Sequence, residues 1–237
     1  MGFNVHQSSE AETDSLAAAA REVGRCLRPD GSTSGKEWDF ARARETEALI
    51  NWAAKSGRLI PLSAVQGHAK HSGMEHGVWF DEPSGRWLKL TYPGEFGRFP
   101  EIDYALDKQT QKWCQQVLLR VGTPGEYLER LLLSRDLFGD DVNLEGVAQN
   151  GDHACILISQ GHIVGKAPRV REVTVFMRKA GFLPAPDFAW YKPDAGIGAF
   201  DAQIRNFLRT GREIIPIDLI LTPTTGELRN FFLKWAA

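Results

Sequence analysis

Two stretches near the end of the chain decide how it folds: Ala199-Phe200-Asp201-Ala202-Gln203-Ile204-Arg205-Asn206-Phe207-Leu208 and, after a Thr210-Gly211 turn, Glu213-Ile214-Ile215-Pro216-Ile217-Asp218-Leu219-Ile220-Leu221. They contain three polar residues, Asp201, Asn206 and Asp218, each flanked by apolar residues. Short apolar runs of this kind predict buried strands. We therefore expect the three polar side chains to lie at the ends of buried strands.

Two carboxylates and an amide are groups that phosphoryl transfer needs. One carboxylate orients and deprotonates the attacking hydroxyl, and oxygen ligands hold Mg²⁺ against the phosphates. Mg²⁺ accepts such oxygens and keeps several waters. In this interpretation Asp201 is the base, Asn206 a metal ligand and Asp218 the main metal ligand. The structural alternative is that Asp201 and Asn206 are turn or capping residues and that Asp218 closes a strand.

The composition is that of an ordinary globular protein. Of the 237 residues, 43% are hydrophobic and 24% are charged, and the length is sufficient for a core. The 28 basic and 30 acidic residues give a formal charge of −2, so the chain has no global positive field. We expect neither nucleic acid nor a membrane among its partners.

The cysteines and the amino terminus predict a cytoplasmic protein. Cys26, Cys114 and Cys155 are far apart and form no CxxC pair, which argues against a disulfide framework or a zinc site and fits a reducing compartment. The first residues do not form a signal peptide, and no apolar run approaches the roughly 18 residues of a membrane-spanning helix.

Two helices are expected at the start of the chain, over residues 11–27 and 38–55. The first is rich in alanine and ends at Pro29-Asp30-Gly31, and Gly57 ends the second. We interpret residues 1–60 as a helical appendage that buttresses the rest and carries no chemistry.

A β-rich segment with one internal helix follows, over residues 61–160. Strands are expected at 78–80 and 86–90, joined by a turn, and at 144–148 and 154–158, joined by Asn150-Gly151. A helix is expected from Thr123 to about Arg135, where Pro124 follows a capping threonine.

Lys89 lies in the second of these strands, between two leucines. Either it points to solvent from a half-exposed strand, or it is directed at phosphates and pairs with a carboxylate from a helix. Glu126 and Glu129 lie three residues apart in the expected helix, near one side of it, so each is a candidate partner.

The remaining residues, 161–237, form a smaller part that holds the two aspartates. A helix is expected at 169–179, a short strand at 188–191 and a final helical turn at 230–235. The alternation of helix and strand along the whole chain is too irregular for a doubly wound parallel sheet, so we expect the α+β class.

Several fragments, in one order over residues 47–232, resemble the protein-kinase fold, and more narrowly the small Ser/Thr/Tyr kinases associated with polyvalent proteins of phages and conjugative elements. The fragments are Gly73-Met74-Glu75-His76-Gly77-Val78, Trp87-Leu88-Lys89-Leu90-Thr91, Tyr127-Leu128-Glu129-Arg130, Leu137-Phe138-Gly139-Asp140, Leu144-Glu145-Gly146-Val147, Ile158-Ser159-Gln160, Asp201 with Asn206, and Pro216-Ile217-Asp218. The resemblance implies a bilobal fold: the appendage, an N-lobe over 61–160 and a reduced C-lobe over 161–237.

The resemblance also implies ATP and Mg²⁺ as cofactors and a role for each fragment. Gly73, Glu75, His76, Gly77 and Val78 belong to the glycine-rich loop over the phosphates. Lys89 corresponds to the lysine that binds the α and β phosphates, and Glu129 or Glu126 to its helix partner. Ser159 and Gln160 correspond to the hinge beside adenine. Asp201 matches the catalytic aspartate, Asn206 the catalytic-loop asparagine and Asp218 the magnesium aspartate.

The chain departs from the family pattern in places that bear on function. Ala199-Phe200 replaces the His-Arg before the catalytic aspartate, and Leu219-Ile220 follows Asp218 in place of Phe-Gly. Only 19 residues follow Asp218, too few for an activation segment and a peptide-binding helical lobe. The leading hypothesis is transfer of the γ-phosphoryl group to a hydroxyl of a protein. The alternatives are a pseudokinase-like nucleotide-binding interaction module and a small-molecule kinase.

Other candidate sites have weaker support. His68, His71 and His76 with Glu75 suggest a metal cluster, but the glycines between them break any single helix that would hold them. Cys155 lies in an apolar strand, where a buried, inert thiol is expected. Ser159 has no GxSxG sequence around it, so a hydrolase is unsupported.

Overall fold

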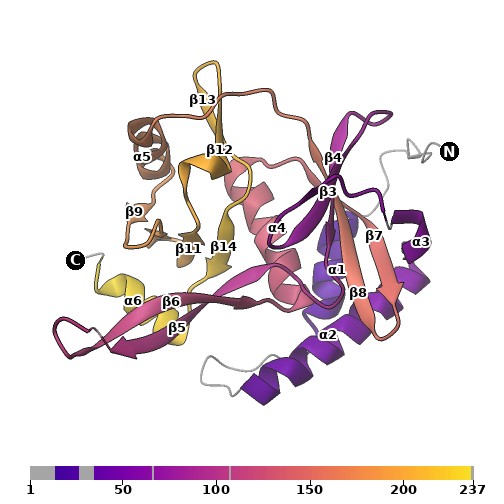
Figure 1. The fold of residues 1–237 in the computed structure, drawn as a ribbon, viewed down its shortest axis with the longest axis horizontal. Helices are drawn as coiled ribbons and strands as arrows, with labels where there is room; N and C mark the ends of the chain where they lie inside the picture. Colours follow the sequence, from indigo (N-terminus) through magenta and orange to yellow (C-terminus); the bar gives the residue numbers. More distant parts are fainter. Residues whose placement is uncertain (1–13, 27–34, 66, 107, 236–237) are drawn as a thin grey trace. The chain divides into compact units, whose positions relative to one another are not determined.

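The computed structural model describes residues 14–26, 35–65, 67–106 and 108–235, and it divides them into two compact units. Unit 1 comprises the described residues up to Gly97 together with Val121–His162. Unit 2 comprises Arg98–Arg120 and the described residues from Ile163 onward. Helices and strands occur in both units without regular alternation, so the expected α+β class is confirmed (Figure 1).

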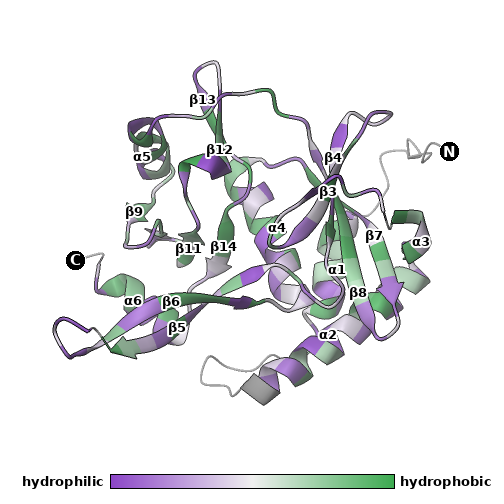
Figure 2. Ribbon diagram, viewed as in Figure 1, coloured by the Kyte–Doolittle hydropathy of each residue, from purple (hydrophilic) through white to green (hydrophobic). Residues whose placement is uncertain are grey.

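Unit 1 is built on a six-stranded sheet. Its strands are β1 (Leu59–Pro61), β2 (His71–Ser72), β3 (His76–Asp81), β4 (Arg86–Thr91), β7 (Val142–Asn150) and β8 (His153–Gly161). They lie in the order β1-β7-β8-β4-β3-β2, with β1 parallel to β7 and all other neighbours antiparallel. The expected turns at 81–85 and Asn150-Gly151 join β3 to β4 and β7 to β8. The central strand β8 is largely apolar, as Figure 2 shows, because both of its faces are covered.

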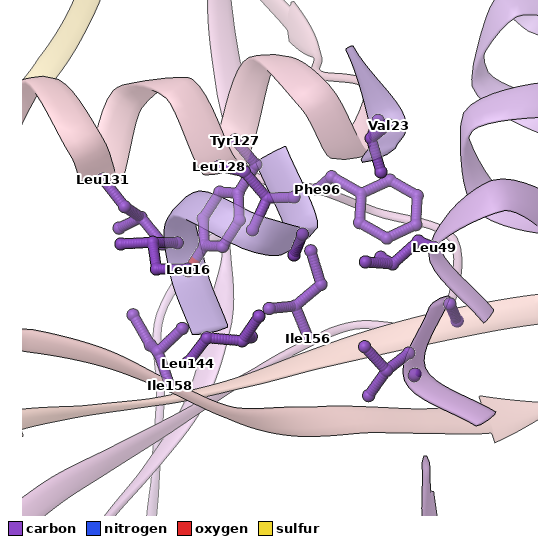
Figure 3. Close-up of a cluster of buried hydrophobic side chains, with 14 of the residues drawn as sticks. Leu16, Val23, Leu49, Phe96, Tyr127, Leu128, Leu131, Leu144, Ile156 and Ile158 are labelled. Carbon is purple, nitrogen blue, oxygen red and sulfur yellow. The ribbon is translucent and has the colours of Figure 1, made fainter. Parts of the chain in front are cut away.

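Three helices cover one face of this sheet. They are α1 (Ser15–Val23), α2 (Gly35–Lys55) and α4 (Pro124–Phe138). Their apolar side chains form one cluster with those of β7 and β8, in which Leu16, Leu49, Leu128 and Ile156 are fully buried (Figure 3). α1 and α2 therefore belong to the core of unit 1 and are not a separate appendage.

The opposite face of the sheet carries its own apolar cluster. It contains Trp79, Leu88, Leu90, Cys155 and Leu157. The short helix α3 (Leu62–Val65) contributes Leu62 and Val65 to this cluster. Residues that alternate along β8 thus point into two different cores.

Helix α4 begins and ends where local chemistry predicts. Thr123 Oγ1 accepts a hydrogen bond from the Glu126 N–H, the Glu126 side chain accepts one from the Thr123 N–H, and Pro124 occupies the first turn. Gly139 ends the helix in the left-handed region at φ 67°. A further carboxylate, Glu45 of α2, is fully buried and accepts a 2.7 Å hydrogen bond from the Gly125 N–H.

Unit 2 contains a four-stranded antiparallel sheet in the order β14-β11-β10-β9. Its strands are β9 (Leu183–Pro184), β10 (Trp190–Lys192), β11 (Ile197–Phe200) and β14 (Ile220–Pro223). A separate hairpin pairs β12 (Phe207–Thr210) with β13 (Glu213–Pro216). The helices are α5 (Val170–Lys179) and α6 (Gly226–Leu233), with a single 3-10 turn at Ile204–Asn206.

A two-stranded ribbon, β5 (Arg98–Leu106) with β6 (Trp113–Val121), interrupts the sequence of unit 1. The chain leaves and re-enters unit 1 at adjacent points, since the Gly122 N–H donates a 3.0 Å hydrogen bond to the Gly97 carbonyl. The ribbon lies beside α6 (Figure 1), and its Ile102 and Val117 pack against the unit 2 cluster that contains Phe231 and Phe232. No helix or strand is predicted for this region from the sequence pattern.

The two units differ from the expected division at 60 and 160. The first expected boundary is absent because α1 and α2 share the core of the sheet, and the second lies close to the observed break after His162. The sequence ranges of the two units also differ in charge: residues 1–97 with 121–162 include 13 basic and 20 acidic residues, and residues 98–120 with 163–237 include 15 and 10. None of the helices described here is both long enough and apolar enough to cross a membrane.

Candidate functional site

The candidate site is formed where β11 ends. Asp201 follows the last residue of that strand and adopts φ 49°, in the left-handed region that aspartate tolerates better than most residues. The chain then makes the 3-10 turn and enters β12. Asn206 lies in this turn, is buried, and donates from Nδ2 to Asp201 at two points, the carboxylate Oδ2 at 2.8 Å and the carbonyl at 2.7 Å.

Two further side chains bind the Asp201 carboxylate. Gln203 Nε2 donates a 2.8 Å hydrogen bond to Oδ1, and the Arg205 guanidinium lies 3.2 Å and 3.3 Å from the two carboxylate oxygens. Arg205 is largely exposed, with 65% of its side-chain surface accessible, so its ion pair with Asp201 is open to solvent. The carboxylate is thus held by the side-chain amides of Asn206 and Gln203 and, on its solvent side, by the Arg205 cation, and these local bonds fix its position.

Two strand pairs, β11 with β14 and β12 with β13, bring the segment that contains Asp218 next to the segment of Asp201 and Asn206. In one ladder Phe200 pairs with Ile220, and in the other Phe207 pairs with Pro216. The segments 201–206 and 217–219 connect these paired ends, so they run side by side. The Ile217 N–H donates a 2.9 Å hydrogen bond to the Asn206 carbonyl, which joins the two segments directly. The segments that carry Asp201, Asn206 and Asp218 therefore lie side by side, although Asp201 and Asp218 are 17 positions apart in the sequence, and the Asp218 side chain is exposed.

Lys89 lies on the helix-covered face of the unit 1 sheet. Its neighbours Leu88 and Leu90 pack on the opposite face, whereas Lys89 itself is paired with Ile158 of β8. Directly paired residues point to the same face, and Ile158 belongs to the core beneath α4. The register with β8 therefore argues against the alternative in which Lys89 lies on the solvent face of a half-exposed strand.

The two glutamates proposed as partners of Lys89 have different surroundings. Glu126 is buried and its carboxylate is engaged in the capping box of α4, whereas Glu129 is half-buried. Across the described part of the chain, no carboxylate lies within ion-pair distance of the Lys89 ammonium group. The pairing of Lys89 with Glu129 stays a prediction, and the capping role of Glu126 makes Glu129 the better candidate.

The expected glycine-rich loop is a tight turn between β2 and β3. Ser72 pairs with Gly77, and the Gly73 N–H donates a 2.9 Å hydrogen bond to the His76 carbonyl, which leaves Met74 and Glu75 at the tip. Gly77 is required by close packing, since a Cβ there would lie 2.8 Å from that of Ala69. Val78, the last residue of the loop, is the β3 residue paired with Lys89.

Two side chains of the loop are bound to α4. Arg130 Nη1 lies 3.1 Å and 2.9 Å from the two Glu75 carboxylate oxygens. The His76 ring Nε2 lies 2.7 Å from the Tyr127 hydroxyl oxygen. All four residues are mostly buried; the side chains of Glu75 and Arg130 are 12% and 7% exposed. Glu75 and His76 therefore attach the loop to the helix, and the contacts they make are with protein groups.

Ser159 and Gln160, expected in the hinge, lie inside β8. Their residues pair with β4 on one side and β7 on the other, so their backbone groups are part of the sheet. Ser159 Oγ donates to Glu145 at 2.5 Å and accepts from Arg86, and Gln160 Nε2 donates to Asp140 at 2.7 Å. The connector between the units begins only after Gly161.

The alternative sites find no support in the described residues. No group of three or more His, Cys, Asp or Glu side chains there could hold a metal ion. Cys155 is 1% exposed, and burial raises the pKa of its thiol to about 11, so at neutral pH it is a protonated, inert group.

The contacts of Arg130 with Glu75 and of Tyr127 with His76 were not indicated by the sequence. Arg130 is 55 residues from Glu75, and nothing in the sequence around either residue predicts their ion pair. The same holds for Arg205, whose place beside Asp201 follows from the 3-10 turn. Comparisons of the chain with protein-family models, with curated proteins and with solved structures gave no match.

Proposed function

We propose that the protein is an ATP- and Mg²⁺-dependent phosphotransferase with a protein-kinase-like fold that transfers the γ-phosphoryl group to a hydroxyl of a protein. The observation that carries this proposal is that Asn206 binds Asp201 and that the segment with Asp218 runs beside them, between the β11–β14 and β12–β13 strand pairs of unit 2. A base and two oxygen ligands in adjacent segments are the protein groups that phosphoryl transfer requires.

The hydrogen bonds of Asn206 support its role as a metal ligand. Its Nδ2 donates to Asp201 twice, so the amide is oriented with Oδ1 directed away from Asp201. An amide oxygen is a suitable ligand for Mg²⁺, and Asp218 would supply a carboxylate oxygen to the same ion. When bound, Mg²⁺ neutralises charge on the phosphates.

In this proposal Asp201 acts as the base. Its carboxylate is fixed by Asn206 and Gln203, and it accepts the proton of the acceptor hydroxyl as that oxygen attacks the γ-phosphorus. Arg205 then occupies the exposed side of the carboxylate and must move aside, or shift to one oxygen, when the acceptor approaches.

Lys89 supports the proposal from unit 1. In a kinase, the lysine of one strand pairs with a glutamate of the helix that follows it. Here α4 follows the lysine strand and packs on the face of the sheet to which Lys89 points. This is the arrangement that a Lys89–Glu129 pair needs.

Transfer from labelled ATP to a generic protein substrate, or to the chain itself, tests the proposal. Asp201→Asn and Asp218→Asn should each lower the transfer rate by at least about 100-fold, because each removes a group that acts in the transition state. Asp194→Asn is the matched control: it lies in the β10–β11 turn, at the other end of the strand that leads to Asp201. Unchanged transfer by Asp218→Asn would remove the assignment.

A nucleotide-binding interaction module is the second candidate, and the Arg205–Asp201 ion pair favours it. The Arg205 guanidinium covers the solvent side of the Asp201 carboxylate, where an acceptor hydroxyl would have to approach. A rise in melting temperature with ATP and Mg²⁺ that is lost in Asp218→Asn, without any transfer, would support this candidate over the first.

A further inference from the structure

Unit 2 carries a group of exposed basic side chains on and beside the β12–β13 hairpin. We define the basic patch as Lys166, Arg169, Arg205, Arg209 and Arg212, all of them exposed. The patch lies in the unit that has an excess of basic residues, although the whole chain has a formal charge of −2. The surplus of positive charge is therefore local.

Backbone pairing holds members of the patch from separate segments together. Lys166 and Arg209 form an antiparallel bridge in which the Lys166 N–H donates to the Arg209 carbonyl at 3.1 Å and the Arg209 N–H returns a bond at 2.8 Å. Glu172 of α5 lies 3.8 Å from Arg209 Nε and accepts a 2.7 Å hydrogen bond from the Arg169 N–H. Glu172 offsets only part of the charge of the patch.

The patch begins at the candidate site. Arg205 binds the Asp201 carboxylate, Asn206 ends the 3-10 turn that leads into the hairpin, and Arg209 lies three residues after Asn206, in β12. At about 3.3 Å per residue, Arg209 lies roughly 10 Å along the strand from Asn206. An extended peptide covers that distance in about three residues.

We infer that the basic patch binds an acidic segment of the phosphoacceptor, with carboxylates about three residues from the hydroxyl that is phosphorylated. This deepens the proposed function and rests on it for the position of the hydroxyl. Val164, Val170 and Ile204 are exposed apolar residues close to the patch in the chain, and they suit the side chains of a peptide. Sites for single-stranded nucleic acid combine basic side chains with aromatic residues on which bases stack, and the patch as defined contains basic side chains alone, so it favours a peptide.

Binding of labelled synthetic peptides to the full-length protein, without ATP, tests the inference. Each peptide has one serine and three glutamates centred three residues before or after it, and matched peptides carry glutamine or lysine. Fluorescence anisotropy should show the tightest binding for a glutamate peptide. The double variant Lys166→Gln with Arg209→Gln should weaken that binding about two- to tenfold, since two exposed charge pairs are lost.

The control is Lys108→Gln with Arg229→Gln, which removes the same charge from exposed positions of unit 2 outside the patch and should leave binding unchanged. Equal affinity for the glutamate, glutamine and lysine peptides overturns the inference. So does tighter binding of a single-stranded oligonucleotide of equal charge, which would assign the patch to nucleic acid.

Adding ATP and Mg²⁺ separates this inference from the proposed function. Binding of the glutamate peptide through the patch without any transfer would contradict the phosphotransferase and leave the acidic-peptide surface standing. Transfer to all peptides at one rate would support the phosphotransferase and contradict the patch. If both hold, the serine of a glutamate peptide is phosphorylated faster than the serine of its matched glutamine or lysine peptide.

Discussion

Asp201 combines a chemical role with an unusual backbone conformation. A residue with a Cβ and no local hydrogen bond costs about 1–2 kcal/mol in the left-handed region, whereas glycine adopts it freely. The sequence identified Asp201 as a candidate base but not this conformation, because φ is set by the crossing from β11 into the 3-10 turn.

The positive φ of Asp201 predicts that glycine at this position is more stable than alanine, the reverse of the usual order for these two residues. Both Asp201→Gly and Asp201→Ala remove the carboxylate, but only alanine carries the cost of the positive φ. Urea denaturation should show Asp201→Ala to be about 1 kcal/mol less stable than Asp201→Gly. Greater stability of the alanine variant would mean that the turn relaxes to a negative φ.

Asp14 links the start of α1 to α4. It caps α1 by accepting a 3.2 Å hydrogen bond from the Ala17 N–H and forms an ion pair with Arg135. The side-chain bond to Arg135 lowers the pKa of Asp14 from its ordinary value of 3.8, the largest of the causes acting on it. A lowered pKa stabilises the fold above the unfolded-state pKa, and this contribution is lost as pH falls through the folded-state pKa.

Asp14→Asn should therefore lower stability at neutral pH only. Asparagine keeps the cap, so the substitution removes the charge alone. Because both partners are partly exposed, the expected loss is about 0.5–1 kcal/mol at pH 7. Urea denaturation should show the difference vanishing as the pH falls below 3.8. A difference that persists in acid would point to the cap and not to the ion pair.

Among the elements, the β2–β3 turn and α4 are joined by a buried ion pair. Glu75 and Arg130 are largely shielded from water, and loss of one partner leaves the other charge buried and uncompensated. Glu75→Gln should therefore cost about 3 kcal/mol in the free energy of unfolding. Chemical denaturation measures this directly.

Glu82→Gln is the control for Glu75→Gln, since Glu82 lies exposed in the β3–β4 turn of the same hairpin and should change stability by no more than about 0.5 kcal/mol. Equal changes in the free energy of unfolding for the two substitutions would show that water replaces the Glu75–Arg130 ion pair in the variant without loss of stability. In that case the turn would not be held by α4.

Elements with a local cause were predictable from the sequence. The α4 boundary follows from Thr123-Pro124, and the β7–β8 turn from Asn150-Gly151. The face to which Lys89 points was not predictable. Leu88 and Leu90 make one side of the strand apolar, but the register with β8 decides which face of the sheet that side lies on. The β5–β6 ribbon was also missed, because its strands carry exposed apolar residues such as Trp113 and Leu118 that blur the alternation.

At the scale of the whole molecule, the ribbon is an excursion from unit 1 that completes unit 2. Replacing residues 98–120 by a short glycine-serine linker should leave unit 1 folded, since Gly97 and Gly122 are already hydrogen-bonded to each other. Unit 2 loses the packing of Ile102 and Val117 against its core, at a cost of about 2–4 kcal/mol.

Hydrogen exchange measured by mass spectrometry checks this prediction segment by segment. Protection should fall in α6 and β14, which belong to unit 2, and persist in β7 and β8 of unit 1. Equal loss in both units would show that they unfold as one body. The division into units was only partly predictable, because contacts such as those of Leu16 with the β7–β8 core join residues more than a hundred positions apart.

The opposite charges of the two units affect how the protein behaves on a chromatographic resin. A net charge near zero suggests a molecule that ion exchangers scarcely retain, but retention depends on the patch that meets the matrix. The acidic excess of unit 1 and the basic excess of unit 2 should let the same preparation, near neutral pH and in dilute buffer, adsorb to both an anion and a cation exchanger, each through a different half of the chain.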